Sequence, residues 1–119
     1  MDKINLAAKL ATFTEHWSPK IVGQVNDVHV KVAKLKGEFP WHHHETEDEL
    51  FLVVKGRLRL EFRDRHVWLD EGEFLVVPHG VEHRPVAEEE VHLVLIEPAG
   101  TLNTGNVRNE RTVDEPEWI

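Results

Sequence analysis

Short runs of β-branched and aromatic residues, separated by glycines, constrain the fold of this chain most strongly. After Pro19 the glycines stand at intervals that suit turns between short strands, which is typical of all-β proteins. We expect strands at Lys20–Gln24, His29–Lys36, Phe39–His44, Glu49–Val54, Arg57–Phe62, His66–Leu69, Glu73–Val77, His83–Val86 and Val91–Glu97. Nine short strands favour a β-barrel or jelly-roll sandwich over a parallel α/β sheet.

The chain before Pro19 has a different pattern. Leu6, Leu10 and Phe13 follow one another at helical spacing behind Asp2, a plausible N-cap, and proline ends the segment. We therefore predict one short amphipathic helix in this N-terminal part.

The length and the apolar content are those of a single domain. The chain has 119 residues, of which 40% are hydrophobic, so it can build a core without disulfides. We divide it into an N-terminal helical segment (1–18), a β-barrel (19–98) and a polar C-terminal tail (99–119) for which the sequence suggests no structure.

Charge and cysteine content exclude several function classes. With 14 Lys+Arg against 22 Asp+Glu the net charge is −8, which disfavours nucleic acid as a partner. The longest apolar runs, Leu50–Val54 and Phe74–Val77, are far shorter than the ~20 residues of a membrane helix, so no membrane partner is expected. The absence of cysteine and of a secretory pattern favours the cytoplasm and leaves histidine and carboxylate chemistry.

Two expected strands are apolar on both faces. Leu50–Val54 and Val91–Ile96 show no alternation, whereas Arg57–Phe62 alternates cleanly. A strand that is apolar on both faces is covered on both faces. The second cover is either the N-terminal helix or another subunit, so a homodimer is a hypothesis.

A histidine and carboxylate cluster is the most informative feature for function. On a strand His42 and His44 point to the same face, roughly 6–7 Å apart at Cα, while His43 points away. If residues 45–48 form a four-residue hairpin loop, Glu49 lies opposite His44 on the same face.

His83 follows the turn Val77–Gly80 and is a further candidate for the same site. Three imidazoles and one carboxylate suit a divalent transition metal such as iron, manganese, nickel, zinc or copper. Trp41, Phe39 and Phe51 flank this cluster and form either a pocket wall or ordinary core.

These residues resemble the two signature motifs of the cupin superfamily. The matching positions are Gly37, His42, His44, Glu49 and Gly56 for the first motif, and Gly72, Pro78, Gly80 and His83 for the second. The first gap is one residue shorter than the usual motif, and Ala87 replaces the terminal asparagine. The resemblance covers residues 37–87.

The resemblance implies a small cupin barrel that holds a metal through His42, His44, Glu49 and His83, with one or two coordination positions open. Small single-domain bacterial cupins of the cupin 2 type look like the metal-binding domain of mannose-6-phosphate isomerases and are similar to dioxygenases. The expected function is a metal-dependent enzyme, of the isomerase or dioxygenase type, acting on a small organic molecule such as a sugar or an enolisable compound. The alternative is a non-catalytic cupin module that binds a small ligand or a metal.

Overall fold

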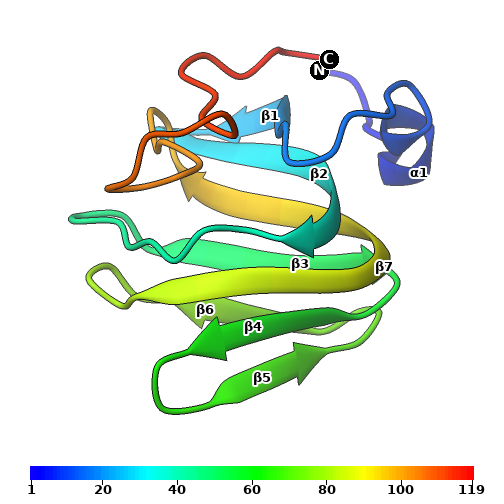
Figure 1. Cartoon of the computed structure of the whole chain (residues 1–119). Coiled ribbons are helices and arrows are strands. Elements are labelled where there is room, and N and C mark those ends of the chain that lie inside the picture. The colour runs from blue at the N-terminus through cyan, green and yellow to red at the C-terminus, as the bar shows by residue number, and fades with distance from the viewer.

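The fold is one antiparallel sheet that closes around an apolar interior, as the computed structural model of residues 1–119 shows (Figure 1). The helix and seven strands are α1 (Leu6–Leu10), β1 (Lys20–Val25), β2 (Val28–Glu38), β3 (Glu49–Lys55), β4 (Leu58–Phe62), β5 (His66–Leu69), β6 (Phe74–Val77) and β7 (His83–Pro98). The prediction of an all-β cupin-type barrel with a short N-terminal helix is therefore confirmed.

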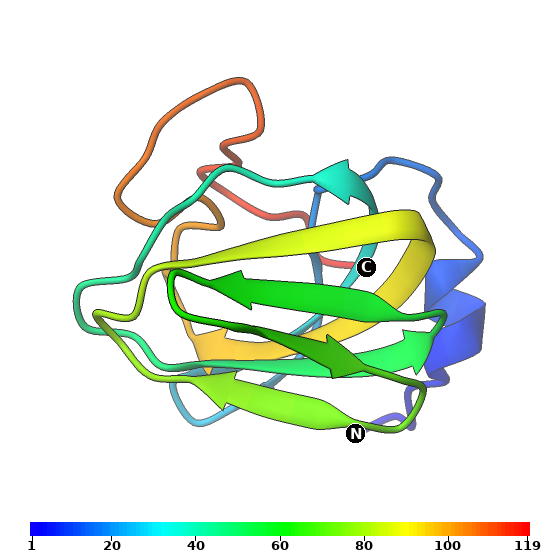
Figure 2. The ribbon, with the colours of Figure 1, turned by 60° about the horizontal axis from the view of Figure 1, so that its bottom comes forward.

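The long strand β7 joins the two layers of the sheet. Its first part pairs with β4 from Phe62↔His83 to Arg59↔Val86, and its second part pairs with β3. The neighbouring strand β2 follows both parts. In Figure 2 β7 curves around one side of the molecule, so that the strands at its two ends face each other across the interior.

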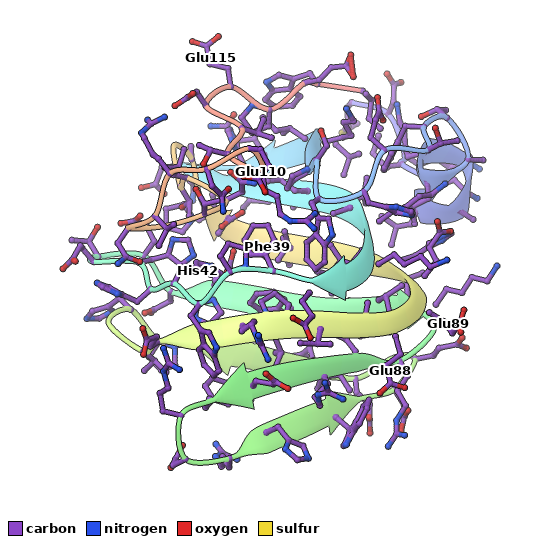
Figure 3. The ribbon with its side chains drawn as sticks, viewed as in Figure 1. Phe39, His42, Glu88, Glu89, Glu110 and Glu115 are labelled. Carbon is purple, nitrogen blue, oxygen red and sulfur yellow. The ribbon has the colours of Figure 1, made fainter.

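A break in the β2–β7 register marks the bend of β7. Leu35 pairs with Val91 and Gly37 pairs with Ala87, so three residues of β7 lie opposite a single residue of β2. These three are Glu88, Glu89 and Glu90, and all are exposed. Figure 3 shows Glu88 and Glu89 pointing away from the molecule at the bend.

The inward faces of the strands form the main core. Alternate residues point inward, such as Ala33 and Leu35 on β2 and Leu93 and Leu95 on β7, and they pack with Phe51. The full cluster of buried residues is Trp17, Ala33, Leu35, Phe39, Phe51, Val53, Leu58, Leu60, Leu69, Val77, Ala87, Val91, Leu93 and Leu95. Ala87, which stands where the cupin motif has asparagine, is fully buried in it.

A smaller cluster covers part of the outer face. Leu10 of α1 and Phe13 pack against Val32 and Val94, the outward residues of β2 and β7. The prediction of cover on both faces is confirmed for the second part of β7 at Val94, where the N-terminal segment provides the cover, whereas Leu52 and Val54 on the outer face of β3 are only partly buried.

Three predictions about local structure are wrong in detail. Residues 39–44 do not form a strand: Pro40 has no N–H for a ladder, and only His42 makes a bridge, to His83. The two strands expected at 83–86 and 91–97 are one, because the bulge accommodates the acidic run within β7. Asn5, not Asp2, caps α1, with its side chain accepting from Ala8 N–H at 2.9 Å.

The C-terminal tail contains no helix or extended strand, but it folds back on the barrel. Its end makes a bridge between Trp118 and Ile21, and Ile119 N–H donates to the Ile21 carbonyl at 3.0 Å. The C-terminal end also reaches α1, since Lys9 Nζ donates to the Ile119 carbonyl. None of the helical structure is long and apolar enough to cross a membrane.

The packing of α1 predicts the effect of a truncated Leu10 side chain. Because Leu10 is 1% exposed, Leu10→Ala leaves a cavity and should lower the free energy of unfolding by about 2–5 kcal/mol. Ile4→Ala is the control, since Ile4 is 43% exposed and its loss should cost under about 0.5 kcal/mol. Urea denaturation measures both, and equal costs would show that Leu10 does not anchor the helix.

Candidate metal centre

Four side chains that can bind a metal converge inside the barrel. Their ligand atoms all lie within 4.8 Å of one another, and all four residues are buried. They are His42 and His44 from the segment between β2 and β3, Glu49 at the start of β3, and His83 at the start of β7. The structure thus brings together every candidate ligand from the sequence, and we call this set the quartet.

A local backbone bridge positions His42 and His83. The N–H of His42 donates to the His83 carbonyl at 3.1 Å, and the N–H of His83 donates to the His42 carbonyl at 2.9 Å. Paired residues on antiparallel chains point to the same face. The two imidazole rings are consequently neighbours, with centroids 4.3 Å apart.

His44 and Glu49 meet in a different way from the hairpin that the sequence suggests. Glu49 pairs with Val77 of β6, and the carbonyl of His44 accepts from Gly80 N–H at 2.7 Å. Both residues are thus held by the chain around the turn before β7. Asp48 Oδ1 reinforces this turn by accepting from the His79 N–H at 2.9 Å.

Backbone carbonyls orient two of the three imidazoles. Nδ1 of His42 lies 2.9 Å from the Pro40 carbonyl, and Nδ1 of His83 lies 2.8 Å from the Val81 carbonyl. A carbonyl accepts only from a protonated nitrogen, so each Nε2 of the neutral ring keeps its lone pair free. This second hydrogen bond is the usual way in which a protein fixes the tautomer of a metal-binding histidine.

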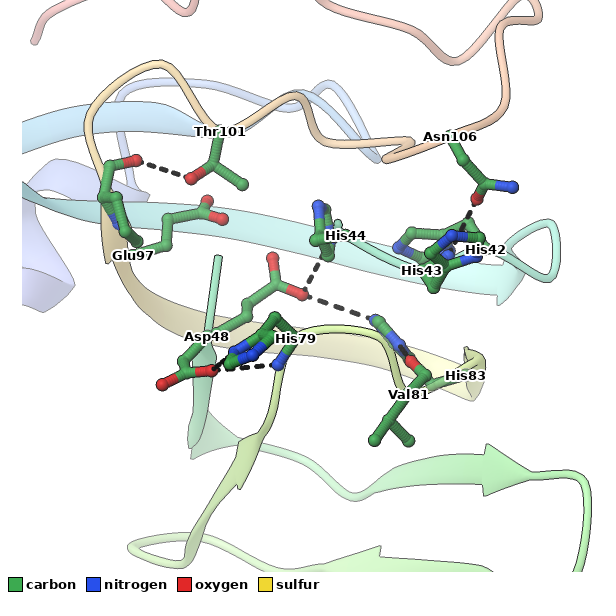
Figure 4. Close-up of polar contacts among 12 residues, drawn as sticks. His42, His43, His44, Asp48, His79, Val81, His83, Glu97, Thr101 and Asn106 are labelled. Atoms are coloured by element: carbon green, nitrogen blue, oxygen red, sulfur yellow. Dashed lines mark hydrogen bonds and ion pairs between the residues drawn. The ribbon is translucent and has the colours of Figure 1, made fainter. Parts of the chain in front are cut away.

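The atoms at the centre of the quartet have no hydrogen-bond partner. Nε2 of His44, Nε2 of His83 and Oε1 of Glu49 are all buried and unpaired. The carboxylate oxygen lies 3.3 Å from the first nitrogen and 3.4 Å from the second, as the dashed lines in Figure 4 show. Buried polar atoms are rarely left without a partner. This donor set is therefore one that a metal ion would satisfy.

The electrostatics keep Glu49 and His42 in the protonation states that metal binding requires. Burial raises the pKa of Glu49, but the His44 and His83 imidazoles outweigh this effect and hold that pKa well below its usual range. Burial, with a smaller contribution from His83, lowers the pKa of His42 to about 4. Near neutral pH the site thus presents a carboxylate and, at His42, a neutral imidazole.

A buried ion pair beside the quartet was not foreseen from the sequence. Lys31 Nζ lies 3.1 Å from Oε1 of Glu97, with side chains 2% and 1% exposed. Burial and then the negative charge of Glu49 raise the pKa of Glu97 well above its ordinary value, although Lys31 opposes this. Glu97 and Glu49 are therefore close enough for each to affect the pKa of the other. The alternation of side chains along a strand could have revealed it, because Lys31 shares the inward face of β2 with Ala33, and Glu97 shares the inward face of β7 with Leu95.

A narrow apolar cavity adjoins the quartet, and its accessible space of about 30 Å³ has room for one or two water molecules. His42 and Glu49 are the two members that line it, and Phe39 points into the interior beside His42 in Figure 3. The other lining residues are Trp17, Pro19, Ala33, Leu35, Phe51, Pro85, Leu93, Leu95 and Asn103. Phe39 and Phe51 thus both pack in the core and line the cavity, whereas Trp41 is not among the lining residues.

The remaining histidines and arginines lie outside the quartet. His43 contacts the exposed Glu45 at 2.7 Å, and His79 contacts Asp48. Arg59 and Arg84 both bind Glu61, at 2.8 and 2.7 Å, and neither lines the cavity.

The low pKa of His42 predicts how the stability of the metal-free protein depends on pH. Between pH 6.5 and about pH 4, His42 is protonated in the unfolded chain but neutral in the folded protein. The free energy of unfolding is therefore unaffected by His42 above pH 6.5. As the pH falls from 6.5 toward 4, His42 lowers this free energy by up to about 1.4 kcal/mol per pH unit. Denaturation of chelator-treated protein between pH 4 and 7 measures this slope. His42→Gln should flatten it, and an unchanged slope would contradict the assignment.

Known proteins resemble this chain in both sequence and fold. The family profile described as "Cupin domain" matches residues 28–97. A cupin-2 domain-containing protein from Shewanella frigidimarina is 45% identical, with a TM-score of 0.79 over 80% of this chain and 93% of that one. Protein NMB1881 from Neisseria meningitidis is 36% identical, with a TM-score of 0.75 over 82% of this chain and all of that one.

A curated relative has a shorter match. The uncharacterized protein YdbB of Bacillus subtilis is 41% identical over 64 residues, which span 53% of this chain and 57% of the relative. The family match extends over more than half of the chain and contains the whole quartet. The chain therefore belongs to the cupin family.

Proposed function

We propose that this protein binds a divalent transition metal ion through His42, His44, Glu49 and His83 and acts as a metal-dependent enzyme on a small organic molecule. An isomerase or a dioxygenase type of reaction fits this donor set. We also propose a cytoplasmic location, because a chain without cysteine needs no oxidising compartment.

The unpaired atoms at the centre of the quartet carry this proposal. Two imidazole nitrogens and one carboxylate oxygen face one another without hydrogen bonds in a buried site. Without a bound ion only the long carboxylate–imidazole contacts of 3.3 and 3.4 Å offset the cost of burying these atoms. Imidazole and carboxylate together suit iron, manganese, nickel, copper or zinc.

Each residue has a distinct part in holding such an ion. His42 and His83 present Nε2 because backbone carbonyls hold Nδ1, and Glu49 supplies the negative charge. When bound, the ion would supply Lewis acidity or redox chemistry to a substrate at its remaining positions. The apolar wall around Phe51 would exclude water from that side.

The cavity lining favours an uncharged substrate. It contains no lysine or arginine, and the buried Lys31 is paired with Glu97. A phosphate group would have no counter-charge there. The cavity thus gives no support to a sugar phosphate, the substrate type that a mannose-6-phosphate isomerase-like role would require. A neutral enolisable or hydroxylated compound fits better.

The alternative is a binding module that captures a small ligand or a metal without turnover. The buried apolar cavity supports this reading equally, since it needs only a ligand. Oxygen uptake and isomerisation assays on metal-loaded protein separate the two functions. A ligand that binds next to the metal and is recovered unchanged favours the module.

Elemental analysis of tag-free protein tests the metal site. The wild type should contain a near-stoichiometric transition metal, and the His42→Ala/His44→Ala double variant and Glu49→Ala should lose most of it, since each change removes a donor from the buried site. His79→Ala is the matched control, because the His79 side chain is 60% exposed and outside the quartet. Equal metal content in all four proteins would refute the site.

We extend the proposal to a homodimer formed by the outer face that α1 leaves uncovered. On the edge strand β6, Phe74 is 61% and Val76 is 45% exposed. They pair with Leu52 and Leu50 of β3, and Leu52 packs on the outer cluster beneath α1. The exposed side chains of β6 thus continue the outer apolar face that α1 covers further along the sheet. A second copy of the chain would bury them by apolar packing, as α1 buries its own part of that face.

The proposed dimer predicts the effect of a charge at its centre. Phe74→Glu should convert a dimer to a monomer in light scattering at micromolar concentration, because a second copy would bury the carboxylate unpaired. Val25→Glu, at the equally exposed Val25 beside the β1–β2 turn, should leave the mass unchanged. A wild-type protein that is monomeric under these conditions would rule out the dimer.

A further inference from the structure

The C-terminal segment 101–119 lies against the part of the chain that bears His42 and His44. It has no regular secondary structure, yet Thr101 and Thr104 within it are 4% and 0% exposed. Thr104 Oγ1 is 2.8 Å from Oγ1 of Thr112, which ties the segment to itself. Figure 1 shows this segment, from orange to red, passing over the end of the barrel. It lies outside the region 28–97 that matches the cupin family.

Asn106 clamps the backbone between the two histidines. Its N–H donates to the carbonyl of His43 at 3.0 Å, and its side-chain Oδ1 accepts from the His43 N–H at 2.9 Å. Both polar backbone groups of the residue between His42 and His44 are thus bound to a single residue of the segment (Figure 4).

Gly105 makes this close approach possible. A Cβ atom at this position would lie 2.2 Å from the His43 carbonyl oxygen and 3.1 Å from Cδ2 of the His42 ring. The backbone φ of +56° also favours glycine. The backbone of the segment therefore passes so near His43 and the His42 imidazole that no side chain fits between them.

The same segment forms one wall of the cavity. Asn103 lines the cavity, and its side chain is fixed by donating to the Arg111 carbonyl at 2.7 Å and by accepting from Val113 N–H at 2.8 Å. The Arg111 guanidinium lies 5.2 Å from the centre of the Trp17 ring, which lines the cavity from the N-terminal side. The segment thus contributes Asn103 to the cavity wall, and it contributes Gly105 and Asn106 to the contacts with the backbone beside His42.

We propose that the C-terminal segment 101–119 is a positioning element of the metal centre, in which Gly105 and Asn106 hold the His42–His44 backbone in the geometry for metal binding. Asn103 belongs to the same element and sets the shape of the cavity wall. This inference rests on the proposed metal binding by the quartet. Loss of a hydrogen-bond partner of a metal ligand typically costs about 10- to 100-fold in metal affinity, and an effect up to this size is expected here because Asn106 binds the residue between two ligands.

Cobalt(II) titration of the full chain tests the role of Gly105. Co²⁺ reports affinity and, through its visible absorption bands, the geometry of its ligands. Gly105→Ala should weaken Co²⁺ binding about 10- to 100-fold and alter these bands. The control is Gly100→Ala, since Gly100 also has a positive φ, of +86°, but a Cβ there would meet nothing within 4 Å. It should bind Co²⁺ within about twofold of the wild type, because only backbone strain is added.

Asn106 provides a second test that does not depend on tolerance of a side chain at Gly105. Asn106→Ala removes the acceptor for His43 N–H and should weaken Co²⁺ binding with altered bands, whereas Asn106→Asp keeps an acceptor oxygen and should restore both. A purely structural role would lower the melting temperature of the variants without changing the cobalt spectrum.

The outcomes separate this inference from the proposed function. A wild-type protein that does not bind Co²⁺ would overturn metal binding by the quartet and the positioning role with it. Binding of Co²⁺ by the wild type, with unchanged affinity and bands in Gly105→Ala and Asn106→Ala, would overturn the positioning role alone.

Discussion

Buried polar atoms need partners, and this requirement governs the architecture around the quartet. Nε2 of His44, Nε2 of His83 and Oε1 of Glu49 lie together in the interior without hydrogen bonds, although the barrel closes around them. Nδ1 of His42 and Nδ1 of His83 are paired with backbone carbonyls, whereas Nδ1 of His44 and Oε2 of Glu97 have no partner either. Unpaired imidazole and carboxylate atoms that face one another in a buried site are a donor set that an ion would satisfy, and the proposed function follows from that arrangement.

The strand β7 makes the arrangement possible. It begins with His83 at the quartet, bends at the exposed glutamates, and returns along the opposite layer to Glu97, whose pKa the negative charge of Glu49 helps to raise. One strand therefore supplies a residue of the quartet and also a buried acid that interacts with it. Lys31 of β2 balances this acid from within the same interior. The quartet and the buried Lys31–Glu97 pair thus form one continuous polar region inside an otherwise apolar barrel.

The sequence predicted the quartet because spacing along the chain is a strong signal for this family. The His-x-His pair, Glu49 and His83 fall at fixed intervals around the turns of the motif, and the structure brings all four together. Strand boundaries were less predictable: Pro40 prevents a regular ladder at 39–44, and three consecutive glutamates look like a turn although they form a bulge within β7. Parity along β2 and β7 was sufficient to place Lys31 and Glu97 inside, but charged residues are rarely assigned to a core. The path of residues 101–119 depends on tertiary contacts such as that of Gly105 with His43, which no local pattern encodes.

The most direct measurement is a crystal structure of the protein purified without a tag, with anomalous scattering data collected on both sides of the absorption edge of the metal found by X-ray fluorescence. We predict one strong anomalous peak at about 2.0–2.2 Å from the imidazole nitrogens of His42, His44 and His83 and from Oε1 of Glu49, as for a typical divalent transition metal. A peak at a different group of residues, or ordered water bridging the quartet in protein supplied with metal, would contradict the account.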